Sequence, residues 1–184
     1  MLMPQESSEG IPGAGALGEL FENHSRQVLS AAYRVTGSRQ DAEDALQTVF
    51  LRLAGRWRDL NLSDTPGAYL RRAAVNAAID LLRSRSAAGA VPLEDMPFEI
   101  SDRSDVSAER QRQDSEFRQR LRKALLVLTD RNATVFCLRY FEEFTNKEIA
   151  AALGVSQTRV AVILHRARKR LQQELLDFVK GEAS

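Results

Sequence analysis

Cysteine, histidine and long apolar runs are scarce in this chain of 184 residues, and each scarcity excludes a class of protein. The single cysteine, Cys137, lies in the apolar run TVFCL and predicts a buried core residue with neither a disulfide nor a metal site. Two distant histidines and no glycine-rich phosphate loop leave no catalytic constellation, so we expect neither an enzyme nor a cofactor. No apolar run reaches the roughly 18 residues of a membrane-spanning helix, and no secretory signal pattern opens the sequence. We therefore expect a cytoplasmic protein that is not inserted in a membrane.

The alternation of apolar and polar residues that marks β-strands is almost missing, whereas apolar residues recur three and four positions apart along most of the chain. This spacing predicts an all-α fold. Gly37 and Gly55 are expected to end the first two helices, Ser38 to cap the second, and a third helix to run over residues 67–85. Three helices joined by short loops predict one small helical bundle.

The formal net charge of +1 conceals segments of opposite character. Residues 87–116 hold eight acids against three bases, with two prolines and no clear period, which predicts a flexible acidic linker. On both sides of it bases outnumber acids, as expected for two small helical domains that meet an anionic partner. We divide the chain into a disordered leader (1–16), the bundle (17–86), the linker (87–116), a second helical domain (117–178) and a tail (179–184).

The segment TNKEIAAALGVSQTRVAVILHRARKR, residues 145–170, has the spacing of a helix-turn-helix. Thr145 and Glu148 form a capping box, Gly154 supplies the left-handed residue of the turn, and Ser156 caps the second helix. A plain helical hairpin with a solvated basic surface would not require a cap and a turn glycine at this spacing. The second helix would then turn one side toward a DNA major groove, with Gln157, Thr158, Arg159, Ala161, Val162, His165 and Arg166.

Three segments, in this order, resemble the bacterial RNA polymerase sigma factors of the extracytoplasmic-function group: DAEDALQTVFLRLAGRW, GAYLRRAAVNAAIDLLR and LRYFEEFTNKEIAAALGVSQTRVAVILHRARKRL. The resemblance implies a subunit that binds core RNA polymerase and directs promoter-specific initiation. It implies that the bundle docks on the clamp helices of the polymerase β′ subunit through Asp44, Gln47 and Thr48. The same bundle would read the −10 element as melted single strand through Arg72, Asn76 and Arg83.

For the second domain, the resemblance implies docking on the β-subunit flap and insertion of the second helix into the major groove of the −35 element. An anti-sigma factor is a further partner that the family implies, although no residue here identifies one. The acidic linker would run through the polymerase near the RNA exit path.

The sequence departs from the family pattern at several positions. Tyr69 replaces the usual tryptophan, and Val75 stands where arginine is common. On the reading helix, Ala161 and Ile163 stand where lysine and arginine are frequent, while Arg159 is an added base. We therefore expect a −35 preference that depends on the start of this helix, with apolar contact from Ala161 or Val162 to a thymine methyl.

Two other hypotheses stay open at this point. A two-domain helix-turn-helix regulator would bind duplex DNA without polymerase and would use the bundle for dimerisation or ligand binding. A sigma-like protein with degenerate DNA binding is also consistent with the apolar middle of the reading helix.

Overall fold

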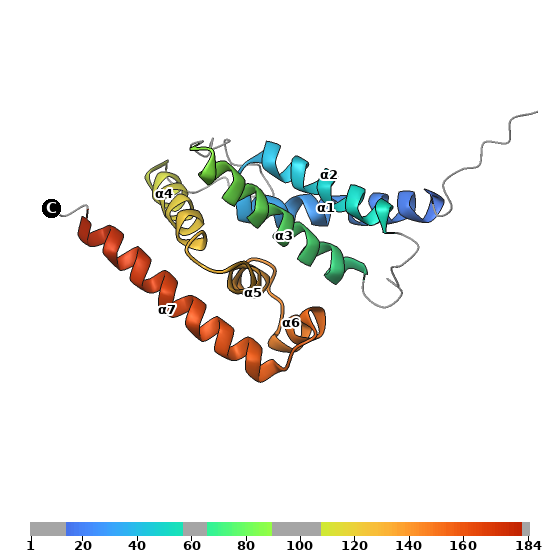
Figure 1. Cartoon of the computed structure of the whole chain (residues 1–184). Coiled ribbons are helices and arrows are strands. Elements are labelled where there is room, and N and C mark those ends of the chain that lie inside the picture. Colours follow the sequence, from blue (N-terminus) through green and yellow to red (C-terminus); the bar gives the residue numbers. More distant parts are fainter. Residues whose placement is uncertain (1–13, 57–65, 90–107, 182–184) are drawn as a thin grey trace, which may run out of the picture.

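The computed structural model describes residues 14–56, 66–89 and 108–181, and this part of the chain folds into helices without a strand (Figure 1). The all-α prediction is confirmed. Helices α1 to α3 form an N-terminal bundle, and α4 to α7 form a C-terminal domain. Within the described residues the helices are α1 (Ala14–Thr36), α2 (Arg39–Gly55), α3 (Pro66–Ala87), α4 (Ala108–Leu125), α5 (Asp130–Tyr140), α6 (Asn146–Leu153) and α7 (Gln157–Gly181).

Two residues that we predicted from the sequence, Gly37 and Ser38, form the turn between α1 and α2. Gly37 has a φ of 68°, in the left-handed region where a side chain is strained, and a Cβ there would also overlap the guanidinium of Arg122. The hydroxyl of Ser38 accepts a hydrogen bond from the backbone N–H of Asp41, which caps α2. α1 therefore ends at Thr36 and α2 starts at Arg39.

The bundle core is built from alanine and branched aliphatic residues on the facing sides of α1, α2 and α3. Small residues such as Ala32 and Ala74, both fully buried, allow the helix axes to approach closely. Leu53 and Leu70 fill the remaining space, and burial of each such side chain contributes about 1.5–3 kcal/mol. The core holds α3 in a fixed orientation, which matters because α3 carries the predicted −10 residues.

The two domains pack against each other, with α3 lying against α5 and α6 (Figure 1). α4 begins at Ala108, inside the stretch 87–116 that we assigned to the linker, and α7 continues to Gly181. Residues 1–13, 90–107 and 182–184 lie outside the described part, so the domain boundaries remain predictions. None of the described helices is long and apolar enough to span a membrane.

Candidate nucleic-acid and polymerase interfaces

The turn between α6 and α7 has the geometry that the sequence predicted. The backbone N–H of Glu148 donates to the hydroxyl of Thr145 at 3.2 Å, and the backbone N–H of Thr145 donates to the Glu148 carboxylate at 2.7 Å. The Thr145 hydroxyl also donates to the same carboxylate at 2.7 Å. The two hydrogen bonds that the carboxylate accepts, first from the Thr145 hydroxyl and then from its backbone N–H, lower the pKa of Glu148. Gly154 follows with a φ of 63°, and Ser156 accepts from the backbone N–H of Arg159. The cap and the turn together fix the angle at which α7 leaves the domain.

Helix α7 has one buried side and one exposed side. Val160, Ile163 and Leu164 pack in the core beneath it, so Ile163 is a core residue and does not reach the exposed side. The other side is open to solvent over the first half of the helix. It carries all seven residues that we predicted for the −35 contact: Gln157, Thr158, Arg159, Ala161, Val162, His165 and Arg166.

A cavity of about 490 Å³ extends this surface from α7 onto the start of α5. Arg131 contributes from the first turn of α5, and Arg159 and Arg166 contribute from α7. Within the described residues, none of these three arginines forms an ion pair. Our sequence reasoning missed Arg131; its place beside the Thr129 cap of a helix in the basic domain was the available signal.

The three residues predicted to read the −10 strand lie together on α3, but they face the C-terminal domain. Arg72 donates to the backbone carbonyl of Ala152. Asn76 accepts a hydrogen bond through Oδ1 from the hydroxyl of Thr134 at 2.8 Å. The sequence predicted a surface of α3 open to nucleic acid, and in this structure that surface is covered.

Arg83 meets the same domain near the end of α3. Its Nη2 donates to the carbonyl of Leu128 at 2.6 Å, and its Nε lies 2.8 Å from the carboxylate of Asp130. The departures noted on this helix have structural explanations. Val75 is fully buried in the bundle core, and the guanidinium of Arg72 lies 5.5 Å from the ring centroid of Tyr69.

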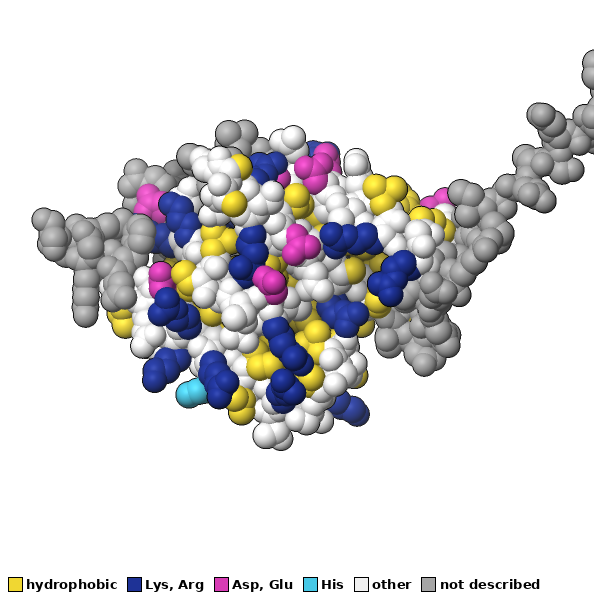
Figure 2. Space-filling model, viewed as in Figure 1, with side chains coloured by type: hydrophobic (Ala, Val, Ile, Leu, Met, Phe, Trp, Pro, Cys, Tyr) yellow, Lys and Arg dark blue, Asp and Glu magenta, His cyan; other side chains and the backbone are white. Residues whose placement is uncertain are grey.

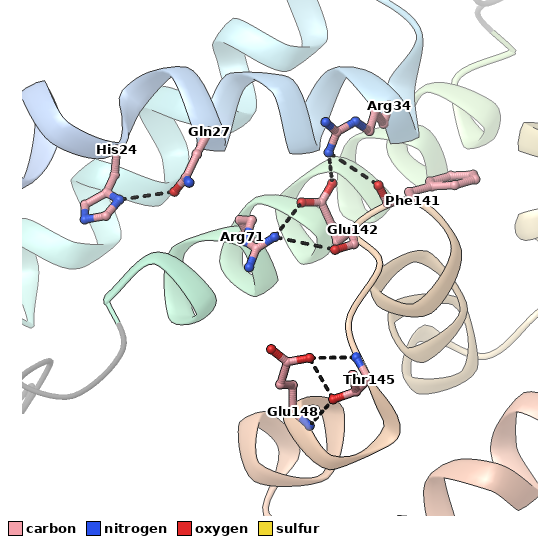
Figure 3. A network of polar contacts seen from close by, with 8 residues as sticks. All are labelled: His24, Gln27, Arg34, Arg71, Phe141, Glu142, Thr145 and Glu148. Atoms are coloured by element: carbon pink, nitrogen blue, oxygen red, sulfur yellow. Dashed lines mark hydrogen bonds and ion pairs between the residues drawn. The ribbon is translucent and has the colours of Figure 1, made fainter.

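Glu142, in the loop after α5, joins the C-terminal domain to α1 and α3 of the bundle (Figure 3). Its side chain is only 1% exposed, and its Oε1 lies 2.8 Å from Nη1 of Arg34 on α1. Arg71 of α3 places Nη1 3.8 Å from Oε2 of the same carboxylate, and its guanidinium lies 4.3 Å from the ring centroid of Phe144. Burial raises the pKa of Glu142, and the two arginines offset part of this effect.

Helix α2 presents the residues predicted to dock on polymerase. Asp44 and Gln47 are exposed, Thr48 is half-buried, and beside them Leu51 is 72% exposed. The opposite side of α2 is packed into the bundle. An apolar side chain flanked by an acid and an amide on an open helix face is suited to docking against a basic partner helix.

These features define a DNA-binding protein of two helical domains, one with a helix-turn-helix and the other with a polar, arginine-rich helix. Comparison with known families agrees: residues 20–88 match the model described as Sigma-70 region 2, and residues 124–173 match Sigma-70, region 4. The chain belongs to the RNA polymerase sigma factors, in their extracytoplasmic-function group.

Individual relatives cover most of the chain. It is 36% identical to the RNA polymerase sigma-E factor of Streptomyces coelicolor over 150 residues, which are 81% of this chain and 80% of that protein. It is 25% identical to the ECF RNA polymerase sigma factor SigW of Bacillus subtilis over 171 residues, 89% of this chain and 90% of that one. Among solved structures, CnrH in complex with the cytosolic domain of CnrY has the same fold, with a TM-score of 0.55, 24% identity, and coverage of 91% of this chain and 92% of that one.

Proposed function

We propose that this chain binds core RNA polymerase and directs initiation at promoters that it recognises through a −35 and a −10 element. The observation that carries the proposal is the exposed start of α7, with seven side chains turned outward from a rigid helix-turn-helix, in a member of the sigma family. The site of action would be the cytoplasm, where polymerase and chromosome are found.

The −35 element would be read in the major groove by the start of α7. Gln157, Thr158 and Arg159 would form hydrogen bonds to base edges, and Ala161 or Val162 would contact a thymine methyl. Arg131 and Arg166, on the two sides of the cavity, would bind backbone phosphates. Because positions 161 and 163 carry no basic side chain, the base contacts would come mainly from the first turn of α7.

The −10 strand would bind on α3 after melting. Asn76 has the amide that is suited to a base edge, and Arg72 and Arg83 are suited to the phosphates on either side. A base is accessible to such contacts only when it is unstacked, so capture on α3 would also help to hold the strands apart.

The polymerase would hold the factor at two places. Helix α2, through Asp44, Gln47 and Thr48, would dock on the β′ clamp helices, and the C-terminal domain would dock on the β flap. Two of the solved structures with this fold are complexes with a second protein, CnrY in one and the anti-sigma factor NepR in the other. An anti-sigma factor is therefore the further partner that we propose.

Transcription by purified core polymerase on a library of genomic templates tests this function. The wild-type chain is expected to stimulate initiation at a small set of start sites that share −35 and −10 sequences. The Asp44→Ala/Gln47→Ala double variant should lose polymerase binding and stimulation. A matched control, Glu22→Ala/Asn23→Ala, removes an exposed acid and an exposed amide from α1 and should retain both. No stimulation by the wild-type chain on any template would overturn the proposal.

The same variants distinguish this function from the alternative, a DNA-binding regulator that acts without polymerase. A regulator that acts without polymerase would select duplex DNA from a random library by itself, and the α2 double variant would leave that selection unchanged. Its DNA targets would not coincide with start sites of transcription in the reconstituted system.

A further inference from the structure

We propose that Val162 contacts the C5-methyl group of one pyrimidine in the −35 element, so that this chain binds a −35 site with 5-methylcytosine there more tightly than the same site with cytosine. The inference rests on the proposed −35 role of α7. The group that is recognised is a methyl in the major groove. Two bases carry it on the same ring carbon: thymine, and cytosine that a DNA methyltransferase has modified.

The first support is the position of Val162 around the helix. Each residue advances about 100° around an α-helix, and the buried residues of α7 mark its inward direction. Thr158, Val162 and His165 lie on the opposite side, and all three are exposed. A single exposed valine is ordinary on a protein surface. This valine, however, lies in the middle of the side that would face the floor of the groove.

The second support is the charge on both sides of Val162. Arg159 comes three residues before it and Arg166 four residues after it, so both lie next to it on the helix surface. All three side chains line the cavity that Arg131 also lines. These bases attract the polyanionic duplex toward this part of α7. Val162, which is 44% exposed in the free chain, would lose its water when the duplex binds.

The third support is the chemistry of the major groove. Base edges display hydrogen-bond donors and acceptors there, and the C5-methyl of a pyrimidine is the apolar group among them. A valine pressed against a donor or acceptor would displace its water and leave it without a partner, which weakens binding. Against a methyl group, both surfaces gain by leaving water. A pyrimidine methyl is therefore the group that suits Val162.

Ala161 is the other apolar residue that we predicted for this contact, and it is the less suitable of the two. It lies toward the edge of the outward side, by the same advance of about 100° per residue. Its side chain ends at Cβ, whereas Val162 extends further by two methyl groups. The small side chain of Ala161 leaves room for a base edge to approach its neighbour. We therefore assign the methyl contact to Val162.

A consequence for regulation follows from the two sources of the methyl group. When cytosine replaces thymine at the contacted position, the methyl is lost, and methylation of that cytosine restores it. Promoters with cytosine at this position would respond to DNA methylation, and promoters with thymine there would not. A cytosine-C5 methyltransferase is the class of enzyme that would supply the modified site.

The test uses the full-length chain with core polymerase and the −35 duplex that they select from a random library. Each thymine is replaced in turn by uracil, which pairs in the same way but lacks the methyl. Each position is also converted to cytosine or to 5-methylcytosine opposite guanine. Fluorescence anisotropy of fluorescein-labelled duplexes at fixed salt measures affinity. At one position, thymine should bind about fourfold more tightly than uracil, and 5-methylcytosine about fourfold more tightly than cytosine, as expected for burial of one methyl-sized group.

Variants of exposed valines assign the contact. Val162→Ala should bind the thymine and uracil duplexes equally, and the 5-methylcytosine and cytosine duplexes equally. Val162→Thr keeps the shape of the side chain but replaces a methyl with a hydroxyl, so it should reduce the preference. Val127→Ala is the matched control: Val127 is 38% exposed between α4 and α5, and its truncation should leave the fourfold preference intact. Far-UV circular dichroism verifies that each variant is folded.

Equal binding of both bases in every pair, at every position, would overturn the proposal. A preference that persists in Val162→Ala would show that another residue contacts the methyl. A preference for thymine over uracil without one for 5-methylcytosine over cytosine would overturn the response to methylation.

The outcome is separable from that of the transcription test. If initiation is normal and the methyl group has no effect on binding, only this inference fails. If the chain selects duplex DNA by itself and does not initiate with polymerase, the proposed function fails, and the same comparison is made on the duplexes that the chain selects. If the chain selects no duplex in either setting, both fail.

Discussion

Glu142 and Glu148 lie six residues apart in the same domain, and their surroundings shift the pKa values of the two carboxyls in opposite directions. Burial at the domain interface raises the pKa of Glu142, whereas hydrogen bonds from Thr145 lower the pKa of Glu148, which is exposed. Glu148 therefore keeps its charge and caps the start of its own helix, α6. Glu142 is costly to bury as an anion, which fits a contact that forms and breaks.

Arg159→Ala should weaken binding of the −35 duplex by about 1–3 kcal/mol, because a base-reading arginine makes two hydrogen bonds that alanine cannot replace. Arg159 is exposed at the start of α7 and has no acidic partner among the described residues. The measurement is a titration of the selected −35 duplex and of a scrambled duplex at fixed salt. A loss confined to the selected duplex assigns Arg159 to a base, and an equal loss on both contradicts the base-reading role.

Asn76→Ala should slow formation of the open promoter complex while initial binding of holoenzyme to duplex promoter is retained, because the amide meets its base only after melting. Permanganate reactivity of unpaired thymines measures melting. Thr134→Val is the matched control: it removes the same interdomain hydrogen bond of 2.8 Å but leaves the amide in place. Normal melting with Asn76→Ala, or equal defects in the two variants, would contradict the −10 role of Asn76.

At the scale of single elements, the start of α6 depends on its cap. Thr145→Ala removes the hydroxyl that accepts from the Glu148 backbone, and loss of such a cap costs about 1 kcal/mol of unfolding free energy. Urea denaturation followed by circular dichroism measures this cost. Thr158→Ala removes a threonine of α7 that is exposed and does not cap the helix, so it should change stability by less than about 0.5 kcal/mol. Equal midpoints for the two variants would show that the capping box does not stabilise α6.

Elements with local signals were predictable from the sequence, and this is why the helix-turn-helix was located. Thr145, Gly154 and Ser156 act on residues at most four positions away, so their pattern alone identifies the turn. The buried side of α7 was likewise predictable, because its apolar residues recur three and four positions apart. The start of α4 at Ala108 was not predicted, because an acidic, proline-containing context masked the onset of the helix.

Contacts between distant segments could not be predicted in this way. Asp41 is buried in the first turn of α2 and pairs with Arg85 at the end of α3, although its surroundings read as an ordinary polar helix start. No local pattern marks Glu142, which lies between α5 and α6. Both are buried only because segments far apart in the sequence meet, and nothing in the local pattern carries that information.

At the scale of the whole molecule, a net charge of +1 proves to be a poor guide to DNA binding. Lys and Arg side chains predominate over Asp and Glu on the face that displays α3 and α7 (Figure 2). One acid of the C-terminal domain, Glu142, is buried and paired with two arginines of the N-terminal bundle. The distribution of charge, and not its sum, determines where a polyanion binds.

The packing of the C-terminal domain against the bundle should become less stable as pH rises. The pKa of Glu142 is raised above its ordinary value near 4.5, so between the ordinary and the raised pKa the chain with packed domains binds more protons than a chain whose domains have separated. The stabilisation is therefore complete below about pH 4.5 and is lost as pH rises through the raised pKa. The groups that face the carboxyl are Arg34 from α1, Arg71 from α3, the neighbouring Glu143, and Cys137, whose own pKa is raised by burial.

Guanidinium groups keep their charge across this range, and the thiol stays protonated, so the change is expected to come from Glu142. Small-angle X-ray scattering from the free chain between about pH 5 and pH 8 measures it: the radius of gyration should increase with pH in the wild-type chain. In Glu142→Gln, which cannot titrate, the radius should depend much less on pH, while Glu143→Gln should behave as the wild type does. A radius that decreases with pH, or an equal slope in Glu142→Gln, would show that this carboxyl does not control the packing of the two domains.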